Sequence, residues 1–259
     1  MVQSGEPHVV DPAGRPSIHV DGDADLAPRP RPVPRSHWQI PPPEDADEDG
    51  VVGLGADLAP ATLVSCYRDG IFPWPHDDVP LPWFSPDPRA VIPVSEVHVS
   101  RSLRRTLRQC GWTTTVDRAF PDVMAACGTD RGEDGTWITS EMLAAYTALH
   151  DLGWAHSVEV WDGDDLVGGI YGVQVGAVFT GESMFHRATD ASKVALVDLV
   201  QRLAGAGGHL LDVQILTDHL ATLGAREVPR AIFLAALRRW RDLDVRLTRG
   251  PRAATDLLD

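Results

Sequence analysis

Helix-type and strand-type hydrophobic patterns alternate along most of this chain, and the alternation limits its fold more than any other feature. Apolar residues at helical spacing predict helices at 100–109, 117–127, 139–151, 190–205 and 229–241. Strand-type runs lie at 112–116, 156–161, 166–174, 177–185 and 210–216, and the turn WDGDDLV joins two of them as a hairpin. The sequence contains neither an internal repeat nor heptads. The pattern therefore predicts a mixed α/β domain.

Changes in composition divide the chain into four parts. Residues 1–35 are rich in Pro, Asp and Gly and predict a disordered extension. Residues 36–89 predict a small N-terminal α/β domain, 90–248 the main domain, and 249–259 a C-terminal tail.

The N-terminal part combines one short helix with a stiff loop. In the helix, Asp57 is the expected cap, Pro60 lies in the first turn and Gly70 ends it. The following segment, 70–91, is rich in proline and aromatic residues, which excludes a regular helix or a central strand. A loop packed on itself and a wall over a ligand cleft both fit this segment.

Net charge and cysteine content narrow the class of protein. A formal charge of -14 argues against a general nucleic-acid binder, because phosphate contacts require Lys and Arg. The three cysteines follow neither a metal-ligand spacing nor a disulfide framework, which indicates a reducing compartment. A signal peptide and a membrane-spanning run are also missing from the sequence. We therefore expect a cytoplasmic protein with no metal, no cofactor and no membrane partner.

Positive charge is nevertheless concentrated in one predicted helix. Arg101, Arg104, Arg105 and Arg108 are spaced i, i+3, i+4 and i+7, so their guanidinium groups share one face. Like charges so placed repel one another unless an anion faces them. A solvated face and a phosphate-binding face both fit this pattern.

Two polar residues interrupt the apolar run at 210–216. In a strand, Asp212 and Gln214 share one face, whereas Leu211, Val213 and Ile215 share the other, which we expect to be the core face. An unpartnered buried carboxylate would take up a proton. Asp212 therefore predicts either a polar pair satisfied by the backbone or a functional site.

A second strand carries a comparable pattern. In AVFTGESMF, alternation places Glu182 and Met184 on one face. If this strand neighbours the Asp212 strand, the two strands line one cleft that is polar at one end and apolar at the other. Such a cleft suits a ligand with an amine and a hydrophobic side chain.

Several ordered motifs resemble one protein family. GLGADLAPATL, YRDGIFPW, WFSPDPRAV, GTWIT, HSVEVW, LVGGIYGV, GESMF, ASKVAL and LLDVQIL are similar to those of bacterial leucyl/phenylalanyl-tRNA-protein transferases over roughly residues 50–248. The resemblance implies transfer of leucine or phenylalanine from aminoacyl-tRNA to the N-terminal amine of proteins that begin with Arg or Lys, which marks them for degradation. It also implies that the main domain has an acetyltransferase-superfamily (GNAT-like) fold.

The resemblance also implies roles for particular residues. An aminoacyl pocket would involve Trp74, Trp137, Glu182 and Met184, and Asp212 and Gln214 match a pair with a catalytic role. Ile170 stands where the family commonly has methionine, so the donor stays open among leucine, phenylalanine and methionine. The arginine face at 101–108 would bind tRNA.

Our mechanistic hypothesis is that Asp212 orients Gln214 and helps to draw a proton from the attacking amine. A route assisted by the terminal ribose hydroxyl of the tRNA is the alternative. Two rival classes are an acyl-CoA-dependent N-acyltransferase, which the glycine-poor segment HRATDASKVAL opposes, and a non-catalytic tRNA- or degron-binding protein.

Overall fold

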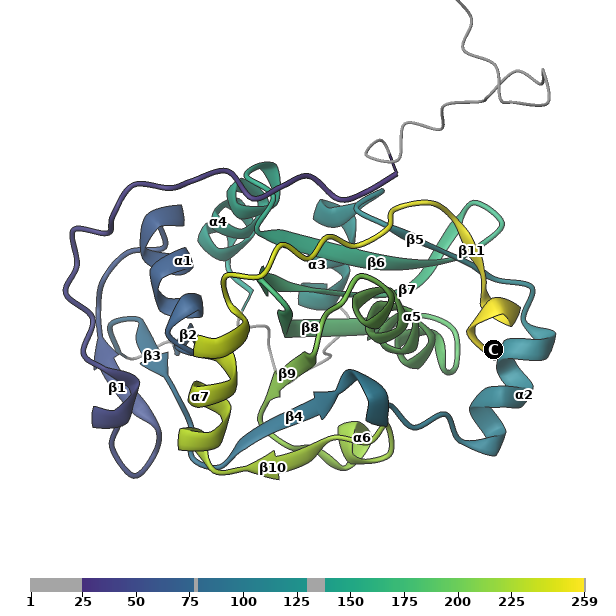
Figure 1. Cartoon of the computed structure of the whole chain (residues 1–259). Helices are drawn as coiled ribbons and strands as arrows, with labels where there is room; N and C mark the ends of the chain where they lie inside the picture. The colour runs from purple at the N-terminus through teal and green to yellow at the C-terminus, as the bar shows by residue number, and fades with distance from the viewer. Residues whose placement is uncertain (1–24, 77–78, 130–137, 259) are drawn as a thin grey trace, which may run out of the picture.

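A computed structural model describes residues 25–76, 79–129 and 138–258 (Figure 1). The helices are α1 (Pro60–Arg68), α2 (Arg101–Gln109), α3 (Phe120–Thr129), α4 (Ser140–Asp151), α5 (Ala191–Gly205), α6 (Asp218–Ala221) and α7 (Arg230–Trp240). Short 3-10 helices are η1 (Pro43–Asp45), η2 (Val94–Glu96) and η4 (Ala254–Leu258). The strands are β1 (Val51–Leu54), β2 (Phe72–Pro73), β3 (Pro82–Phe84), β4 (Arg89–Pro93), β5 (Thr113–Val116), β6 (Ala155–Asp162), β7 (Asp165–Val175), β8 (Val178–His186), β9 (Leu210–Gln214), β10 (Arg226–Val228) and β11 (Arg252–Ala253).

One eight-stranded sheet organises the molecule, in the order β10-β4-β9-β8-β7-β6-β5-β11. Its neighbouring strands are antiparallel except β8 and β9, which are parallel and connected through α5. Helix α5 covers one face of the sheet, and α3 lies on the other (Figure 1). The mixed α/β prediction is confirmed, and each helix and strand predicted after residue 90 has a counterpart within a few residues.

The segment at 70–91 differs from its prediction. It contributes β2 and β3 to a second sheet of order β1-β3-β2, so β3 is a central strand. Pro82 is tolerated because it is the first residue of β3. Helix α1 also differs in detail, because Ala59 is the N-cap, and Asp57 instead accepts hydrogen bonds from the Ala59 amide and the Thr62 hydroxyl.

The described residues near both chain ends are more structured than predicted. Residues 25–35 pack along the domain rather than forming a disordered extension: Ala27 is buried, and Leu26 bridges Thr248. Residues 1–24 lie outside the described residues. The expected C-terminal tail instead supplies β11, which pairs with the edge strand β5, and Leu257 of η4 is buried.

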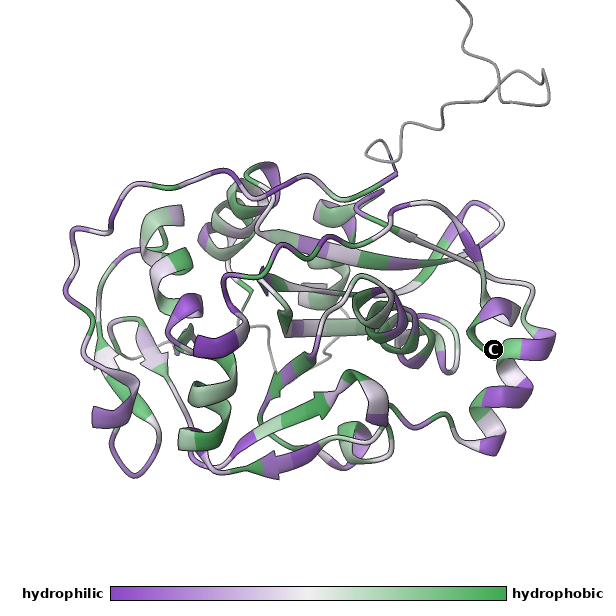
Figure 2. Ribbon diagram, in the orientation of Figure 1, coloured by the Kyte–Doolittle hydropathy of each residue, from purple (hydrophilic) through white to green (hydrophobic). Residues whose placement is uncertain are grey.

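Two apolar cores lie on opposite faces of the large sheet. One joins α1, α3, α4 and α7 with the small sheet, and the other joins α2, α5 and η4. Figure 2 shows the apolar colour on α5 and on the strands beside it. The small sheet therefore shares a core with the main sheet, and the predicted domain boundary at 89/90 cuts through β4.

The parallel pair β8–β9 separates after a short stretch of pairing. Thr180 pairs with Asp212, and the backbone pairing between the two strands ends there. The register of β8 against β7 shifts next to Glu182, where Ser183 faces Tyr171 and Gly181 faces Gly172. Gly172 is required at this bulge because a Cβ atom there would approach the Thr180 carbonyl oxygen to 2.1 Å. The bulge and the separation open the sheet where the polar residues lie.

Candidate active site

Two clefts meet where β8 and β9 separate. The first, of about 280 Å³, is lined by Phe72, Pro73, Trp74, Glu182, Val213, Gln214, Ile215, Thr217 and Leu220. The second, of about 190 Å³, is lined by Ile170, Gly181, Glu182, Ser183, Met184, Val213, Gln214, Thr217, His219 and Leu220. Glu182 and Gln214 belong to both, so the expected neighbourhood of the two strands is confirmed.

Asp212 is fully buried and has a charged partner. Arg89 of β4 donates from Nε to Oδ1 and from Nη2 to Oδ2, each at 2.7 Å. The Thr180 hydroxyl donates to Oδ2 at 3.1 Å, and the Gln214 amide donates to Oδ1 at 3.0 Å. Each carboxylate oxygen therefore accepts two hydrogen bonds, which leaves little capacity to accept another proton. Asp212 thus holds the backbone at Gln214.

Arg89 is itself held on every side. Its guanidinium carbon lies 4.8 Å from the ring centroid of Phe72 and 4.5 Å from that of Phe233, and Nη1 donates to the Gly70 carbonyl at 3.2 Å. Gly70 has a φ of 78°, and a Cβ atom there would meet the Leu234 side chain at 2.7 Å. The ion pair therefore connects β9 with the small sheet and with α7.

Gln214 and Glu182 bridge the gap between the separated strands. Gln214 has a φ of 64°, a conformation that ends the regular strand and turns its side chain towards β8. Its Nε2 donates to Glu182 Oε1 at 2.9 Å, while the Tyr146 hydroxyl donates to Oε2 at 3.2 Å. The Tyr67 hydroxyl contacts that of Tyr146. Because an ionised carboxylate only accepts hydrogen bonds, Gln214 Oε1 is the amide atom left for a ligand.

Burial raises the pKa of the Glu182 carboxyl to about 7, and the hydrogen bonds from Tyr67 and Tyr146 oppose this rise only in part. The nearby Asp212 charge raises it further. Glu182 therefore changes charge close to neutral pH, where a small change in its surroundings alters its ionisation.

The structure brings most of the predicted pocket residues together, with one difference. Ile170 and Met184 line the second cleft, and Trp74 lines the first. Glu182 and Met184 do not share one face as predicted: Met184 packs against the core beneath α5, whereas Glu182 contacts Tyr146 on the other face. The bulge at Glu182 shifts the alternation by one residue. Trp137 lies outside the described residues.

The strand prediction at 210–216 also needs correction. Leu210 and Leu211 are both buried, each in a different core, so β9 is buried on both faces. Ile215 is 42% exposed and lines the first cleft, because the turn at Gln214 takes it out of the sheet.

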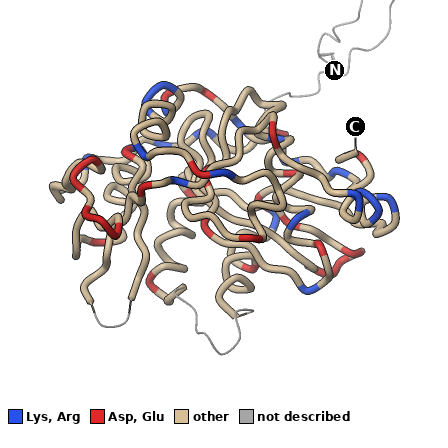
Figure 3. Tube along the Cα trace, turned by 90° about the horizontal axis from the view of Figure 1, so that it is seen from below, with Lys and Arg blue, Asp and Glu red and all other residues tan. Residues whose placement is uncertain are grey.

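The arginine face of α2 is present and lies away from the clefts. Arg101, Arg104, Arg105 and Arg108 are all exposed, whereas Leu103 and Leu107 face the core. Among the described residues these four arginines make no ion pair, and Figure 3 shows basic residues gathered on this helix. Ser100 caps the helix through the Leu103 amide.

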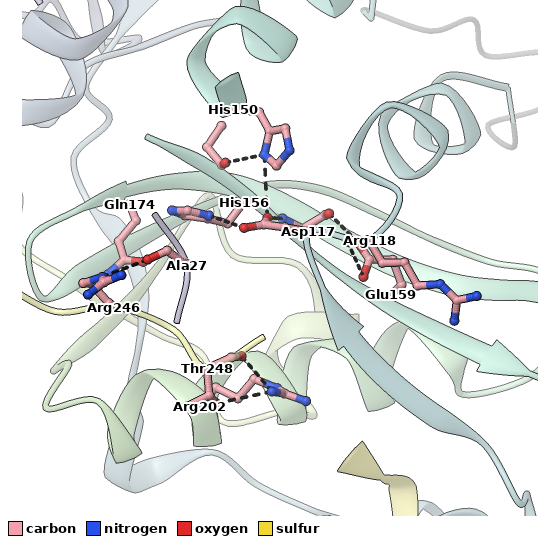
Figure 4. Close-up of polar contacts among 12 residues, drawn as sticks. Ala27, Asp117, Arg118, His150, His156, Glu159, Gln174, Arg202, Arg246 and Thr248 are labelled. Carbon is pink, nitrogen blue, oxygen red and sulfur yellow. Dashed lines mark hydrogen bonds and ion pairs between the residues drawn. The ribbon is translucent and has the colours of Figure 1, made fainter. Parts of the chain in front are cut away.

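A second polar cluster lies elsewhere in the molecule (Figure 4). Ligand-type atoms of Asp117, His150 and His156 lie within 4.8 Å of one another. Asp117 accepts from the Ser157 amide at 3.1 Å and bonds His156 Nδ1 at 2.9 Å, while His150 Nδ1 bonds the Ala155 carbonyl at 2.9 Å. Burial alone would raise the pKa of Asp117, but the charge and hydrogen bond of His156 outweigh it and lower that pKa. These three side chains already bond one another or the backbone, and we therefore interpret the cluster as structural.

Sequence reasoning missed the residues that hold the site. Arg89, Tyr67 and Tyr146 lie far along the chain from Glu182 and Asp212, and no local spacing joins them. One signal was available for Arg89, a cation at the start of the apolar run RAVIP. A buried cation implies a buried acid, and Asp212 was already a candidate.

Comparisons with known proteins show the family of the chain. A family model described as leucyl/phenylalanyl-tRNA protein transferase matches residues 91–238, and the model of that transferase's N-terminal domain matches residues 56–87. The leucyl/phenylalanyl-tRNA--protein transferase of Anaeromyxobacter dehalogenans (strain 2CP-C) is 53% identical over 202 residues, covering 77% of this chain and 87% of the relative. That of Tolumonas auensis is 50% identical over 206 residues, covering 78% and 88%. Among solved structures, L-PGS from Bacillus licheniformis matches with a TM-score of 0.36 and 11% identity over 58% of this chain and 51% of that one, which carries no argument about the fold.

The protein is therefore an enzyme, an aminoacyltransferase that depends on aminoacyl-tRNA. It belongs to the leucyl/phenylalanyl-tRNA-protein transferase family, whose members transfer leucine or phenylalanine from aminoacyl-tRNA to protein N-termini. This membership sets aside the alternative of a non-catalytic binding protein. No helix among the described residues is long and apolar enough to cross a membrane.

Proposed function

We propose that the paired clefts bind the 3′ end of leucyl- or phenylalanyl-tRNA and transfer its amino acid to proteins that begin with Arg or Lys, which marks them for degradation. The observation that carries this proposal is the Glu182–Gln214 bridge between the separated strands, with apolar side chains of both clefts around it. The donor side chain lies against Ile170 and Met184, and Trp74 bounds the other cleft. Methionine stays a third candidate donor.

The reaction depends mainly on correct positioning of the amine and the ester. The ester is already activated, and the acceptor is an α-amine with an ordinary pKa of about 7.7 to 8.0. A C–N bond forms, the ester C–O bond breaks, and a proton passes from the amine to the leaving ribose oxygen. Correct orientation of the two reactants contributes up to about 7 to 11 kcal/mol to such a reaction.

Gln214 is the residue placed to orient the amine. Because Glu182 fixes its Nε2, its Oε1 accepts an N–H from the amine and aligns the nitrogen lone pair with the ester carbon. An amide oxygen is too weak a base to keep the proton. The vicinal ribose hydroxyl of the donor therefore fits as the carrier of the proton to the leaving oxygen, as in the substrate-assisted route.

Asp212 acts through Gln214 as a positioning residue, which modifies the hypothesis that it helps to draw the proton. Its oxygens are occupied by Arg89, Thr180 and the Gln214 amide, and its side chain is 0% exposed. Its contribution is to fix the positive-φ backbone of Gln214 that aims the amide at Glu182.

The acid at the bridge suits the acceptor. A terminal Arg or Lys brings a side-chain cation close to the α-amine, and Glu182 supplies negative charge where the two clefts meet. The arginine face of α2 binds the tRNA through phosphates, which gives affinity with little sequence preference.

A direct transfer assay tests the proposal. Purified protein is mixed with radiolabelled Leu-tRNA or Phe-tRNA and peptides that begin with Arg, Lys or Ala, and label entering the peptide is counted. We expect transfer to the Arg and Lys peptides only. Transfer to all three peptides would refute the acceptor assignment, and no transfer would refute the function.

Variants separate positioning from general-base chemistry. Gln214→Ala should lower single-turnover transfer at saturating substrates by at least about tenfold, within the range that one positioned polar group contributes. The matched control Gln39→Ala, an exposed glutamine that lines neither cleft and lies outside α2, should leave the rate unchanged. An unchanged rate in Gln214→Ala would remove this residue from the mechanism.

Fold subclass and location stay as proposals beside the activity. The GNAT-like assignment of 90–248 is supported by α5, which crosses over between the parallel strands β8 and β9 on one face of an otherwise antiparallel sheet. We infer a cytoplasmic site of action because aminoacyl-tRNA is the donor.

A further inference from the structure

Three ionisable side chains lie between the arginine face of α2 and the clefts, and the proposed chemistry uses none of them. His186 is the last residue of β8, Lys193 lies in the first turn of α5, and His219 lies on α6. We call these three residues the basic strip. His186 and His219 are exposed, and the Lys193 side chain is 31% exposed. Lys193 is also the only lysine of the chain.

The strip connects with α2 at one end. The Thr106 hydroxyl of α2 donates to Asp190 Oδ2 at 2.9 Å, and Lys193 Nζ lies 2.8 Å from Asp190 Oδ1. Asp190 therefore fixes the lysine beside the helix that carries the four arginines. The ammonium group has three donors and gives one to Asp190, so others remain for a ligand.

The strip reaches the second cleft at its other end. His219 lines this cleft together with Ile170 and Met184. Burial lowers the pKa of His219, and the nearby charges of Lys193 and His186 lower it further. Met184 packs against the same core as α2 and α5, so these two helices and the Met184 wall of the second cleft lie on one side of the sheet.

Lys193 supplies a cation along the basic strip and the imidazoles supply hydrogen-bond donors, a combination that suits the phosphates of a nucleic-acid backbone. The 3′ end of a tRNA is single-stranded, and its successive phosphates need donors along the route from the paired stem to the aminoacyl ester. Single-stranded nucleic acids are bound by grooves whose positive charge follows the backbone. Asp190 bonds both Lys193 and Thr106, and its side chain is less exposed than that of Lys193.

We propose that the basic strip binds backbone phosphates of the single-stranded 3′ end of the aminoacyl-tRNA and leads it from the α2 arginine face to the second cleft. This inference rests on the proposed function. It divides the tRNA contacts in two: α2 holds the paired region, and the strip holds the last nucleotides.

Binding of a fluorescent CCA trinucleotide, which lacks the paired acceptor stem proposed to contact α2, tests the strip. We expect Lys193→Gln to weaken binding about three- to tenfold and to reduce the salt slope, log K against log salt, by about 0.7, the value for one lost phosphate contact on a single strand. The double variant Asp190→Asn/Lys193→Gln should bind the trinucleotide as weakly as Lys193→Gln. This result would exclude repulsion by an Asp190 charge that has lost its lysine partner. Arg239→Gln, an exposed site on α7, is the matched control.

Transfer from two short donors gives a second readout. One donor is leucyl-CCA, and the other is leucyl-adenosine, which carries no phosphate. Lys193→Gln should raise the Michaelis constant for leucyl-CCA several times more than the constant for leucyl-adenosine. Equal changes for both donors, or an unchanged salt slope for the trinucleotide, would refute phosphate binding by the basic strip. Failure of the wild-type protein to transfer leucine from intact tRNA would instead count against the proposed function, because trinucleotide binding is measured without transfer.

Discussion

The buried charge of Asp212 is neutralised by Arg89, and this pairing fits a positioning role better than proton transfer. A buried carboxylate with a bidentate arginine stays ionised and fixed in place, whereas a general base must exchange protons with its surroundings. Glu182 is the opposite case: it lies where the strands separate, receives hydrogen bonds only from neutral groups, and has a pKa raised by burial to about 7. The two neighbouring acids thus differ in ionisation because only Asp212 is hydrogen-bonded to a cation.

Removal of Arg89 should lower the free energy of unfolding substantially. Arg89→Leu leaves Asp212 charged and buried, and loss of one partner of such a pair costs about 3 to 5 kcal/mol of the free energy of unfolding. The double variant Arg89→Leu/Asp212→Leu should recover a large part of this loss, as urea denaturation would measure. A double variant as unstable as the single one would show that Arg89 acts through packing between Phe72 and Phe233 instead.

Ionisation of Glu182 should appear in both stability and activity. Its pKa is 4.5 for the free group and about 7 in the folded protein, so the folded state binds the proton more tightly. The contribution to stability is complete below pH 4.5 and is lost as the pH rises through about 7. Transfer to an Arg peptide should change in the other direction, increasing as Glu182 becomes charged. Glu182→Gln should lower transfer and keep only the pH dependence of the acceptor amine, and a wild-type-like profile would contradict the role of Glu182.

At the residue scale, the sequence identified polar residues but not their partners. Alternation in two strands was enough to single out Glu182, Asp212 and Gln214. Arg89 was missed because the partners are 123 residues apart, and only the folded sheet brings β4 next to β9. Met184 was assigned to the wrong face because a single bulged residue reverses every position that follows it.

At the scale of elements, like charges at i,i+4 spacing weaken α2 locally, and we propose that tRNA phosphates compensate for this repulsion. Arg101→Ala/Arg105→Ala should weaken tRNA binding and reduce its salt slope by about 0.9 for each lost phosphate contact. Removing the i,i+4 repulsion should leave the free energy of unfolding unchanged or raise it by a few tenths of a kcal/mol. Filter binding at several salt concentrations measures the slope. An unchanged slope would show that this face is only solvated.

Elements with regular periodicity were predictable, whereas their irregular ends were not. The apolar pattern gave α5 and β6 almost to the residue because these elements are long and buried. The small sheet was missed because β2 and β3 are too short for periodicity and contain proline. The turn at Gln214 was also missed, since a positive φ at glutamine leaves no mark in the sequence.

At the scale of the whole molecule, the C-terminal segment closes the edge of the main sheet. Arg252 bonds Asp198 at 3.0 Å, and Ala254 and Leu257 are buried against the α2–α5 core. Deletion of residues 250–259 should therefore lower the free energy of unfolding by about 2 to 4 kcal/mol, from lost apolar burial and from an ion pair left incomplete. Urea denaturation measures the loss, and deletion of residues 1–24 serves as the comparison. A truncated protein as stable as the full chain would contradict this role.

The connection through Arg89 has a consequence for how sequence changes propagate. Phe72 of the small sheet, Phe233 of α7 and Asp212 of β9 all contact one guanidinium group. A substitution that enlarges or shrinks any of these neighbours moves the same arginine, and through Asp212 it shifts the backbone of Gln214. Homologous chains are thus expected to exchange residues at these positions as a set, because a change at one position without the others would displace the backbone at Gln214.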